Sequence, residues 1–236
     1  NASTGEFNTS LGSLSMGAGV ATGDGNVALG YKAGIDITSG ASNILIGYQA
    51  GDTISTGNNN IAIGTFALDS EDGGGHNIAI GRHALGTLDA GANAKSVAIG
   101  YEAGLAMTTG VRNTIIGGLA GDAMTTTSDN VAIGYEALTS ATIGDGNVAV
   151  GNHALYTNVA ADRNIAIGYQ ALYLATAAST VDSYNTAIGF QAADHITSGV
   201  QNTILGGLAG NAINTGDNNI IIGYNAAASA AGVDNT

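Results

Sequence analysis

The chain has 236 residues, with 18 acidic and five basic side chains and a net charge of −13. Nucleic-acid and anionic-lipid binding need clustered Lys and Arg, and here the basic residues are scattered: Lys32, Arg82, Lys95, Arg112 and Arg163. The absence of Cys removes disulfides and thiolate metal sites, and no apolar run approaches the roughly 18 residues of a membrane helix. We therefore expect neither nucleic-acid binding nor membrane insertion.

The first 25 residues match poorly to the pattern that fills the rest of the chain. The chain starts at Asn1 without a Met or a signal-like segment, which suggests processing or a piece of a longer protein. We expect residues 1–25 to be a lead-in with one degenerate coil. That coil would use Ser13-Leu14-Ser15-Met16-Gly17, placed 13 residues before the first regular copy.

A nine-residue motif, seen as Asn164-Ile165-Ala166-Ile167-Gly168-Tyr169-Gln170-Ala171-Leu172, recurs twelve times from Asn26 onward. Nine of the eleven spacings are 17 residues, and the others are 19 and 21. A fixed period of this length is typical of a solenoid with stacked coils. We expect residues 26–227 to form an all-β parallel β-roll or β-solenoid of about 12–13 coils, and residues 228–236 to be a tail that continues to an adjoining segment. The copies begin at Asn26, Asn43, Asn60, Asn77, Ser96, Asn113, Asn130, Asn147, Asn164, Asn185, Asn202 and Asn219.

Three columns of the motif are nearly invariant. Position five is Gly in every copy, which indicates a positive φ or a place too crowded for a Cβ atom. Position eight is Ala in every copy, so that site accepts little more than a methyl group. Position one is Asn in eleven copies, and stacked Asn side chains can form an amide ladder along the solenoid.

The alternation within the motif predicts a short strand. Position two is Val, Ile or Thr and position four is aliphatic, so we expect both to face the coil interior. Position three would then point outward as an apolar stripe, which on a soluble protein is normally covered. We expect this stripe to be the contact between copies of a homotrimer; packing on a second sheet of the same chain is the alternative. Its members are Ala28, Leu45, Ala62, Ala79, Ala98, Ile115, Ala132, Ala149, Ala166, Ala187, Ile204 and Ile221.

A size compensation locates the core. Copies with Gly or Ala at position nine carry a bulky third linker residue, as with Gly51 and Ile54. Copies with Leu at position nine carry Glu, Ala or Asn there, as with Leu68 and Glu71, and Leu85 with Leu88 is the exception. Because each coil must be filled to a constant volume, we infer that both sites point into one interior pocket.

Position six is aromatic in seven copies, which are six tyrosines and Phe190. Such residues could contact a receptor by stacking on sugars, or they could pack on one another from coil to coil. The candidate receptor contacts are Tyr31, Tyr48, Tyr101, Tyr135, Tyr169 and Tyr224. The two longer linkers, Gly86–Lys95 and Tyr173–Tyr184, are further candidates because binding loops tend to interrupt a regular surface.

The stretch Ser96-Val97-Ala98-Ile99-Gly100 resembles the core motif of YadA-type trimeric autotransporter adhesin heads. The longer pattern Tyr184–Ala192 is similar to repeats of bacteriophage tail-fibre and virion-appendage proteins. The resemblance covers roughly residues 10–230 and implies a left-handed parallel β-roll with three chains to a fibre. The 17-residue coil differs from the shorter coils of the adhesin heads and favours the phage-type family.

Residues that could carry chemistry are sparse. His83 and His153 share position seven four coils apart, too far for one metal ion, and Glu102 and Glu136 share it two coils apart, near the separation of glycosidase carboxyls. Turns such as Asp24-Gly25-Asn26 and Asp145-Gly146-Asn147 faintly resemble calcium-binding turns, although Asx turns explain them.

We therefore expect no catalytic residue, cofactor or metal site. The function predicted is a structural and adhesive fibre segment of a virion, in a tail fibre or capsid appendage, outside the cell, that mediates host attachment. Its partners would be its own copies, adjoining fibre or virion proteins, and a host surface glycan or protein. The alternatives are a bacterial surface adhesin head, an ice-binding solenoid suggested by Thr-rich linkers such as Thr108-Thr109, and a polysaccharide-degrading tailspike.

Overall fold

The computed structural model describes residues 4–17, 21–91, 93–176 and 181–226, and this part of the chain contains strands and turns but no helix. The backbone forms about 12 turns of an all-β parallel β-solenoid, which confirms the architecture that the repeat predicts. The chain divides into two compact units, Asn1–Ile116 and Gly117–Thr236.

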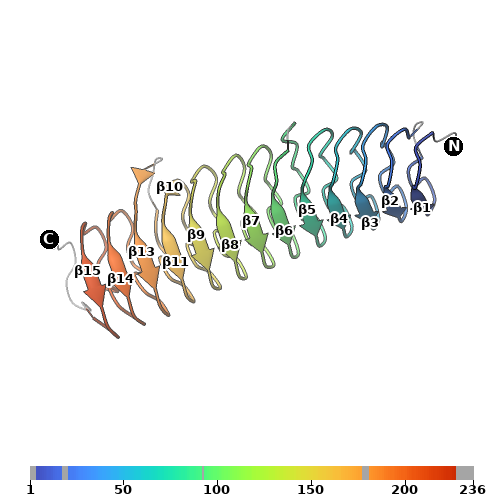
Figure 1. Ribbon diagram of the computed structural model, residues 1–236. Helices are drawn as coiled ribbons and strands as arrows, with labels where there is room; N and C mark the ends of the chain where they lie inside the picture. Colours follow the sequence, from blue (N-terminus) through green and yellow to red (C-terminus); the bar gives the residue numbers. More distant parts are fainter. Residues whose placement is uncertain (1–3, 18–20, 92, 177–180, 227–236) are drawn as a thin grey trace. The chain divides into compact units, whose positions relative to one another are not determined.

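In the first unit seven three-residue strands lie side by side in chain order (Figure 1). All of their printed pairings are parallel and in register, so that Ala28 lies beside Leu45, and Leu45 beside Ala62. The strands are β1 (Thr9–Leu11), β2 (Val27–Leu29), β3 (Ile44–Ile46), β4 (Ile61–Ile63), β5 (Ile78–Ile80), β6 (Val97–Ile99) and β7 (Thr114–Ile116).

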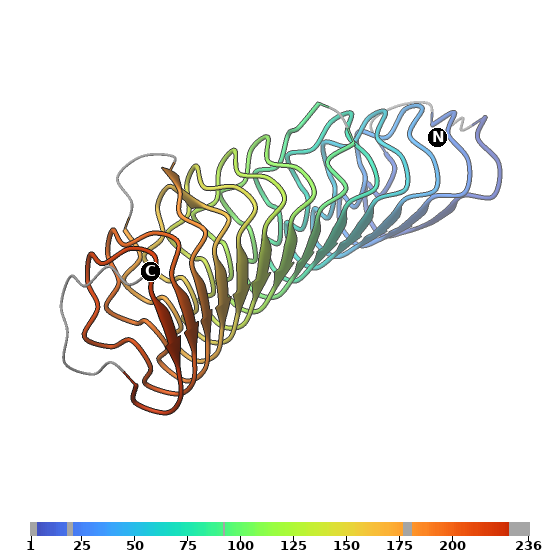
Figure 2. The same cartoon turned by 60° about the vertical axis from the view of Figure 1, so that its left-hand side comes forward.

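The second unit repeats this arrangement with six strands, again parallel and in register. A short extra pair, β10 (Ala161–Asp162) with β12 (Val181–Asp182), forms at the coil that carries the longest linker. The main strands are β8 (Val131–Ile133), β9 (Val148–Val150), β11 (Ile165–Ile167), β13 (Thr186–Ile188), β14 (Thr203–Leu205) and β15 (Ile220–Ile222). Within each unit the strands form one wall of the coils and irregular turns form the others (Figure 2).

The first coil begins earlier than the sequence analysis placed it. Thr9 pairs with Val27 and Leu11 with Leu29, and the main-chain N–H of Asn26 donates to Oδ1 of Asn8 at 2.8 Å. Position one of this coil is therefore Asn8, 18 residues before Asn26, and the placement at Ser13–Gly17 with a 13-residue spacing was wrong. The coil went unrecognised because polar residues occupy position three (Ser10) and position eight, where other coils carry apolar side chains.

The structure reverses the predicted orientation of the strand faces. Every position-three side chain of the predicted trimer stripe is at most 6% exposed, so the stripe faces the interior of its own coil and is no surface between copies. Positions two and four point outward and are half-buried or exposed. The physical reason is the narrow coil, whose interior accepts Ala or one larger side chain from the strand. The corrected residues are Ala28, Leu45, Ala62, Ala79, Ala98, Ile115, Ala132, Ala149, Ala166, Ala187, Ile204 and Ile221.

The predicted size compensation is confirmed, and position three takes part in it. A Cβ atom added to Gly51 would lie 2.8 Å from Cδ1 of Ile54 and 2.8 Å from Cδ2 of Leu45, so the three sites share one pocket. Both Ile54 and Leu68, the position-nine residue of the next coil, are fully buried. Where the strand supplies a large side chain, position nine is Gly, because the pocket holds a fixed volume.

A ladder of buried Asn side chains runs through each unit. The main-chain N–H of Asn43 donates to Oδ1 of Asn26 at 3.0 Å, and that of Asn60 to Oδ1 of Asn43 at 2.9 Å. The Nδ2 group of Asn43 also donates to Gly57 O at 2.9 Å, which closes the turn of its own coil. Since buried polar groups need partners, the predicted amide ladder is confirmed and explains position one.

Close approach between coils explains the position-five column. Gly47 has φ +140°, and a Cβ atom there would lie 2.5 Å from the carbonyl oxygen of Gly64 in the next coil. Both a positive φ and crowding, the two reasons inferred from the sequence, therefore apply at this residue.

The ladder has one fault in the first unit. Ser96 stands where Asn is expected, and its hydroxyl accepts only a 3.2 Å bond from the N–H of Asn113. The linker before Ser96 is two residues longer than usual, and the buried Nδ2 of Asn77 has no hydrogen-bond partner.

We predict that Leu45→Ala lowers the free energy of unfolding by about 2–5 kcal/mol, because it empties the shared pocket. Ile44→Ala, which truncates an outward side chain that is 37% exposed, should cost much less. Urea denaturation of dilute protein measures both. Equal losses, or a larger loss for Ile44→Ala, would contradict the corrected orientation.

Ser96→Asn should raise the free energy of unfolding by about 1 kcal/mol, because it restores a buried amide between Asn77 and Asn113. Ser96→Ala is the matched control and should lower it, since the N–H of Asn113 then loses its acceptor. Thermal and urea denaturation measure both variants, and a destabilised Ser96→Asn variant would show that this coil does not admit the ladder.

Candidate functional site

Positions two and four give each unit an outer aliphatic face, which we define as the outward side chains of its main strands. These side chains are Val, Ile, Leu or Thr, and none is charged. Ile44 is 37% exposed, Ile167 37% and Leu205 44%. Contiguous apolar surface of this kind marks an interaction site in a soluble protein. The outer aliphatic face is therefore the first candidate site.

Aromatic side chains stack from coil to coil in the first unit. The rings of Tyr31 and Tyr48 stack with centroids 5.3 Å apart, Phe66 meets Tyr48 edge-on at 5.4 Å, and His83 stacks on Phe66 at 5.0 Å. These rings come from positions six and seven of four successive coils, and stacking between rings contributes to stability beyond area burial. Their faces are turned toward each other, so their edges and hydroxyl groups remain for a partner.

A denser cluster surrounds His153 in the second unit. Its ring meets Tyr135, Tyr156, Tyr169 and Tyr173 edge-on at centroid distances of 5.8, 5.4, 6.1 and 6.3 Å, respectively. The sequence analysis missed Tyr156 and Tyr173, which lie outside position six and stack on each other at 5.1 Å. Their spacing of 17 residues was the available signal, because it places both on one column of neighbouring coils.

Glu136 sets the electrostatics of this cluster. Its Oε2 atom lies 3.1 Å from Nε2 of His153, and side chains of the pair are about a quarter exposed (26% and 21%). A hydrogen bond to Glu136 raises the pKa of Tyr135, and the negative charge of Glu136 raises the pKa of Tyr156. Both phenols therefore stay protonated at neutral pH and can donate hydrogen bonds to a partner.

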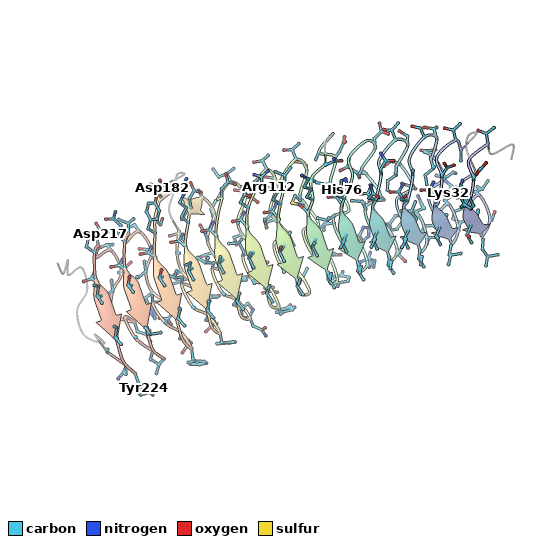
Figure 3. The ribbon with its side chains drawn as sticks, viewed as in Figure 1. Lys32, His76, Arg112, Asp182, Asp217 and Tyr224 are labelled. Atoms are coloured by element: carbon cyan, nitrogen blue, oxygen red, sulfur yellow. The ribbon has the colours of Figure 1, made fainter. Side chains whose placement is uncertain are left out.

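The six predicted receptor tyrosines do not form one site. Tyr101 lies under the guanidinium of Arg82, 5.5 Å from the ring centroid, whereas Tyr31, Tyr48, Tyr135 and Tyr169 contact other rings. Tyr224 is 79% exposed and lies just beyond β15, where Figure 3 shows it projecting from the end of the strand. Cross-coil packing thus accounts for four of them, and their contact with a receptor stays a prediction.

The residues considered for catalysis are engaged within their own units. Glu102 forms an ion pair with Arg82 at 3.1 Å, and Glu136 pairs with His153. Asp24 and Asp145 each accept a 2.7 Å bond from a neighbouring coil's N–H, those of Glu6 and Ser128, as ordinary turn residues do. Within the described ranges no group of three or more His, Cys, Asp or Glu side chains could hold a metal ion.

A buried carboxylate was not anticipated. Glu71 is fully buried at the third linker position, where its Oε1 atom accepts a 2.7 Å bond from the N–H of Gly74. Asn158 holds the equivalent place in the second unit and accepts from the N–H of Ala161 at 2.8 Å. Glu71 therefore closes a turn, and burial raises the pKa of its carboxyl group.

The longer linkers lie partly outside the described residues, at position 92 and at 177–180. In the second linker Arg163 forms an ion pair with Asp182, and its guanidinium lies 5.8 Å from the ring centroid of Tyr184. In the first, the N–H of Ala90 donates to Oε2 of Glu71 at 3.4 Å. Both linkers are thus tied to the coils beneath them where they are described.

The fold and these surfaces define the chain as a parallel β-solenoid repeat protein. No protein-family model matches the sequence, no curated protein matches it, and no solved structure matches its fold. Among the described residues, no helix is long and apolar enough to span a membrane.

A pH dependence follows from Asp69, whose pKa is raised to about 6 by burial and by the nearby charge of Asp52. Since the folded chain disfavours the ionised carboxylate, the free energy of unfolding should fall as pH rises from about 4 to about 6. Asp69→Asn should flatten this fall and leave the first unit more stable by roughly 1 kcal/mol at pH 7, after allowance for partial exposure.

Urea denaturation at pH 4 and pH 7 measures the effect. Ser70→Ala is the control, because it removes the 2.8 Å hydrogen bond from the neighbouring hydroxyl to Gly86 O without removing a charge. An unchanged pH slope for Asp69→Asn would contradict the assignment.

Proposed function

We propose that the chain is a structural and adhesive segment of a fibre on a virion, in a tail fibre or capsid appendage, and that its copies associate laterally as a parallel homotrimer of left-handed β-rolls. The observation that carries this proposal is the outer aliphatic face. It replaces the position-three stripe as the contact between copies.

The chemistry of the outer aliphatic face supports self-association. The face repeats two short aliphatic or Thr side chains per coil, while the chain as a whole carries a net charge of −13. Burying apolar area stabilises a contact by about 25 cal/mol per Å², so an uncharged face repeated over many coils provides the driving force. The acidic side chains lie off the strands, where copies would remain separated by solvent.

The repeat also restricts what can cover this face. Strand neighbours are spaced about 4.8 Å apart, so a partner keeps the same contacts over several coils only if it has the same spacing. Another copy in parallel orientation meets this condition at every coil. The resemblance of Ser96–Gly100 to trimeric adhesin heads and of Tyr184–Ala192 to phage fibre repeats supports three copies and a surface location.

Adhesion is proposed for the opposite kind of surface, where phenol edges and hydroxyl groups project. Tyr135, Tyr156 and Tyr224 offer donors that stay protonated or are strongly exposed. These groups suit hydrogen bonding to a host surface glycan or protein. Catalysis is not proposed, because the paired groups Arg82–Glu102 and His153–Glu136 leave no nucleophile beside a free base.

The proposal predicts a mass of three chains in sedimentation equilibrium at micromolar concentration. Ile63→Lys should shift the mass to one chain, because it places a charge on the outer aliphatic face while the long stem of Lys leaves the coil folded. Thr56→Lys, an exposed turn residue of the preceding linker, adds the same charge away from the face and should keep the trimer. A monomeric parent chain, or an unchanged mass for Ile63→Lys with native circular dichroism, would contradict lateral association through this face.

A further inference from the structure

The last coil of the second unit carries a buried acceptor without a donor. Asn219 is fully buried, and its Oδ1 atom has no hydrogen-bond partner. In the preceding coil Oδ1 of Asn202 accepts both the N–H and the Nδ2 group of Asn219 at 2.9 Å. The orphaned oxygen therefore occupies the place where the ladder receives the Asn of a following coil.

The strand beside Asn219 is also open. β15 is the final strand in the order of its sheet, and Ile220 and Ile222 are 73% and 67% exposed. In the pair before it, the N–H of Thr203 donates to Asn219 O at 2.7 Å, and the N–H of Gly223 donates to Leu205 O at 2.8 Å. By the same pattern, the N–H of Ile220 and the carbonyl of Ile222 face a strand that is missing among the described residues.

The first coil presents the complementary groups. β1 begins its sheet, and all three of its residues are exposed. Ladder geometry directs three groups of this coil away from β2: the N–H and C=O of Asn8 and the N–H of Gly12. The interior of the coil is lined by Ser10 and Ser15, whose hydroxyls hydrogen-bond to each other, so this end is polar inside as well as along its edge. A sheet edge of this kind readily pairs with another chain.

We propose that the last coil of one copy binds the first coil of another, with β15 pairing in parallel with β1. In this register Ile220 N–H donates to Asn8 O, Gly12 N–H donates to Ile222 O, and Asn8 N–H donates to the orphaned Oδ1 of Asn219. Each of these bonds repeats one that already joins consecutive coils.

The partner is a second copy because the edges match in both groups and register. An arbitrary strand would satisfy the main-chain groups of β15, yet only one that follows an Asn-type position one places an N–H opposite the buried Oδ1 of Asn219. The contact joins different surfaces of the two copies, so it is heterologous and repeats without closing. It therefore lengthens the assembly along its axis, whereas the outer aliphatic face sets its width.

The test removes one donor at each end. Ile220→Pro deletes an N–H that has no partner in the isolated chain, and Ser10→Pro deletes one on the outer side of β1; Pro is tolerated at such edge sites. Ile220→Val is the matched control that keeps the N–H. Circular dichroism and melting temperature verify that each variant is folded.

Electron microscopy and sedimentation velocity should show that the parent chain and Ile220→Val form particles of multiple lengths that grow with concentration. Each Pro variant alone should stay at one length. An equimolar mixture of Ile220→Pro and Ser10→Pro should give particles of double length and none longer, because each variant keeps one open end.

A parent chain of single length at every concentration would overturn the proposal, as would a folded Ile220→Pro variant that lengthens like Ile220→Val. Particle width reports lateral association separately, so Ile63→Lys should narrow the particles without abolishing their axial pairing.

Discussion

The buried Asn ladder is the interaction on which the rest of the structure depends. An amide enclosed in a narrow coil must satisfy both its oxygen and its nitrogen. Asn43 does so by linking three coils: it donates its N–H to Asn26, receives the N–H of Asn60, and closes its own turn at Gly57. Coils must therefore stack closely and in register, which excludes a Cβ atom at positions such as Gly47 and limits the interior to one shared pocket.

The period, the Asn ladder and the shared pocket could be predicted because each is a regularity along the sequence. The direction of the strand faces could not be predicted from alternation alone, since alternation is the same for either face. The size relation between Leu45 and Gly51 held the missing information, because compensation requires that both fill one space. The coil at Asn8 escaped notice because Ser10 and Ser15 break the apolar pattern at the open end of the sheet.

The candidate sites were less predictable, because they depend on how side chains from different coils meet. Tyr31 and Tyr48 were found as a column, yet only the structure shows that their rings stack on each other. The cluster around His153 combines several columns, and its contacts depend on side-chain rotation as well as on spacing. Glu71 looked like a surface charge by composition, and only its bond to Gly74 N–H explains its burial.

The direction of the ladder has a consequence for how the chain is assembled during synthesis. The N–H of each position-one Asn reaches back to the preceding coil, while its Nδ2 group bonds to a turn 14 residues ahead, as with Asn26 and Gly40. A new coil can therefore dock as soon as it leaves the ribosome, since its template already exists and the amino-terminal part folds first. Each unit behaves as a one-dimensional lattice, and its growing tip always carries one unsatisfied amide oxygen that selects the next rung.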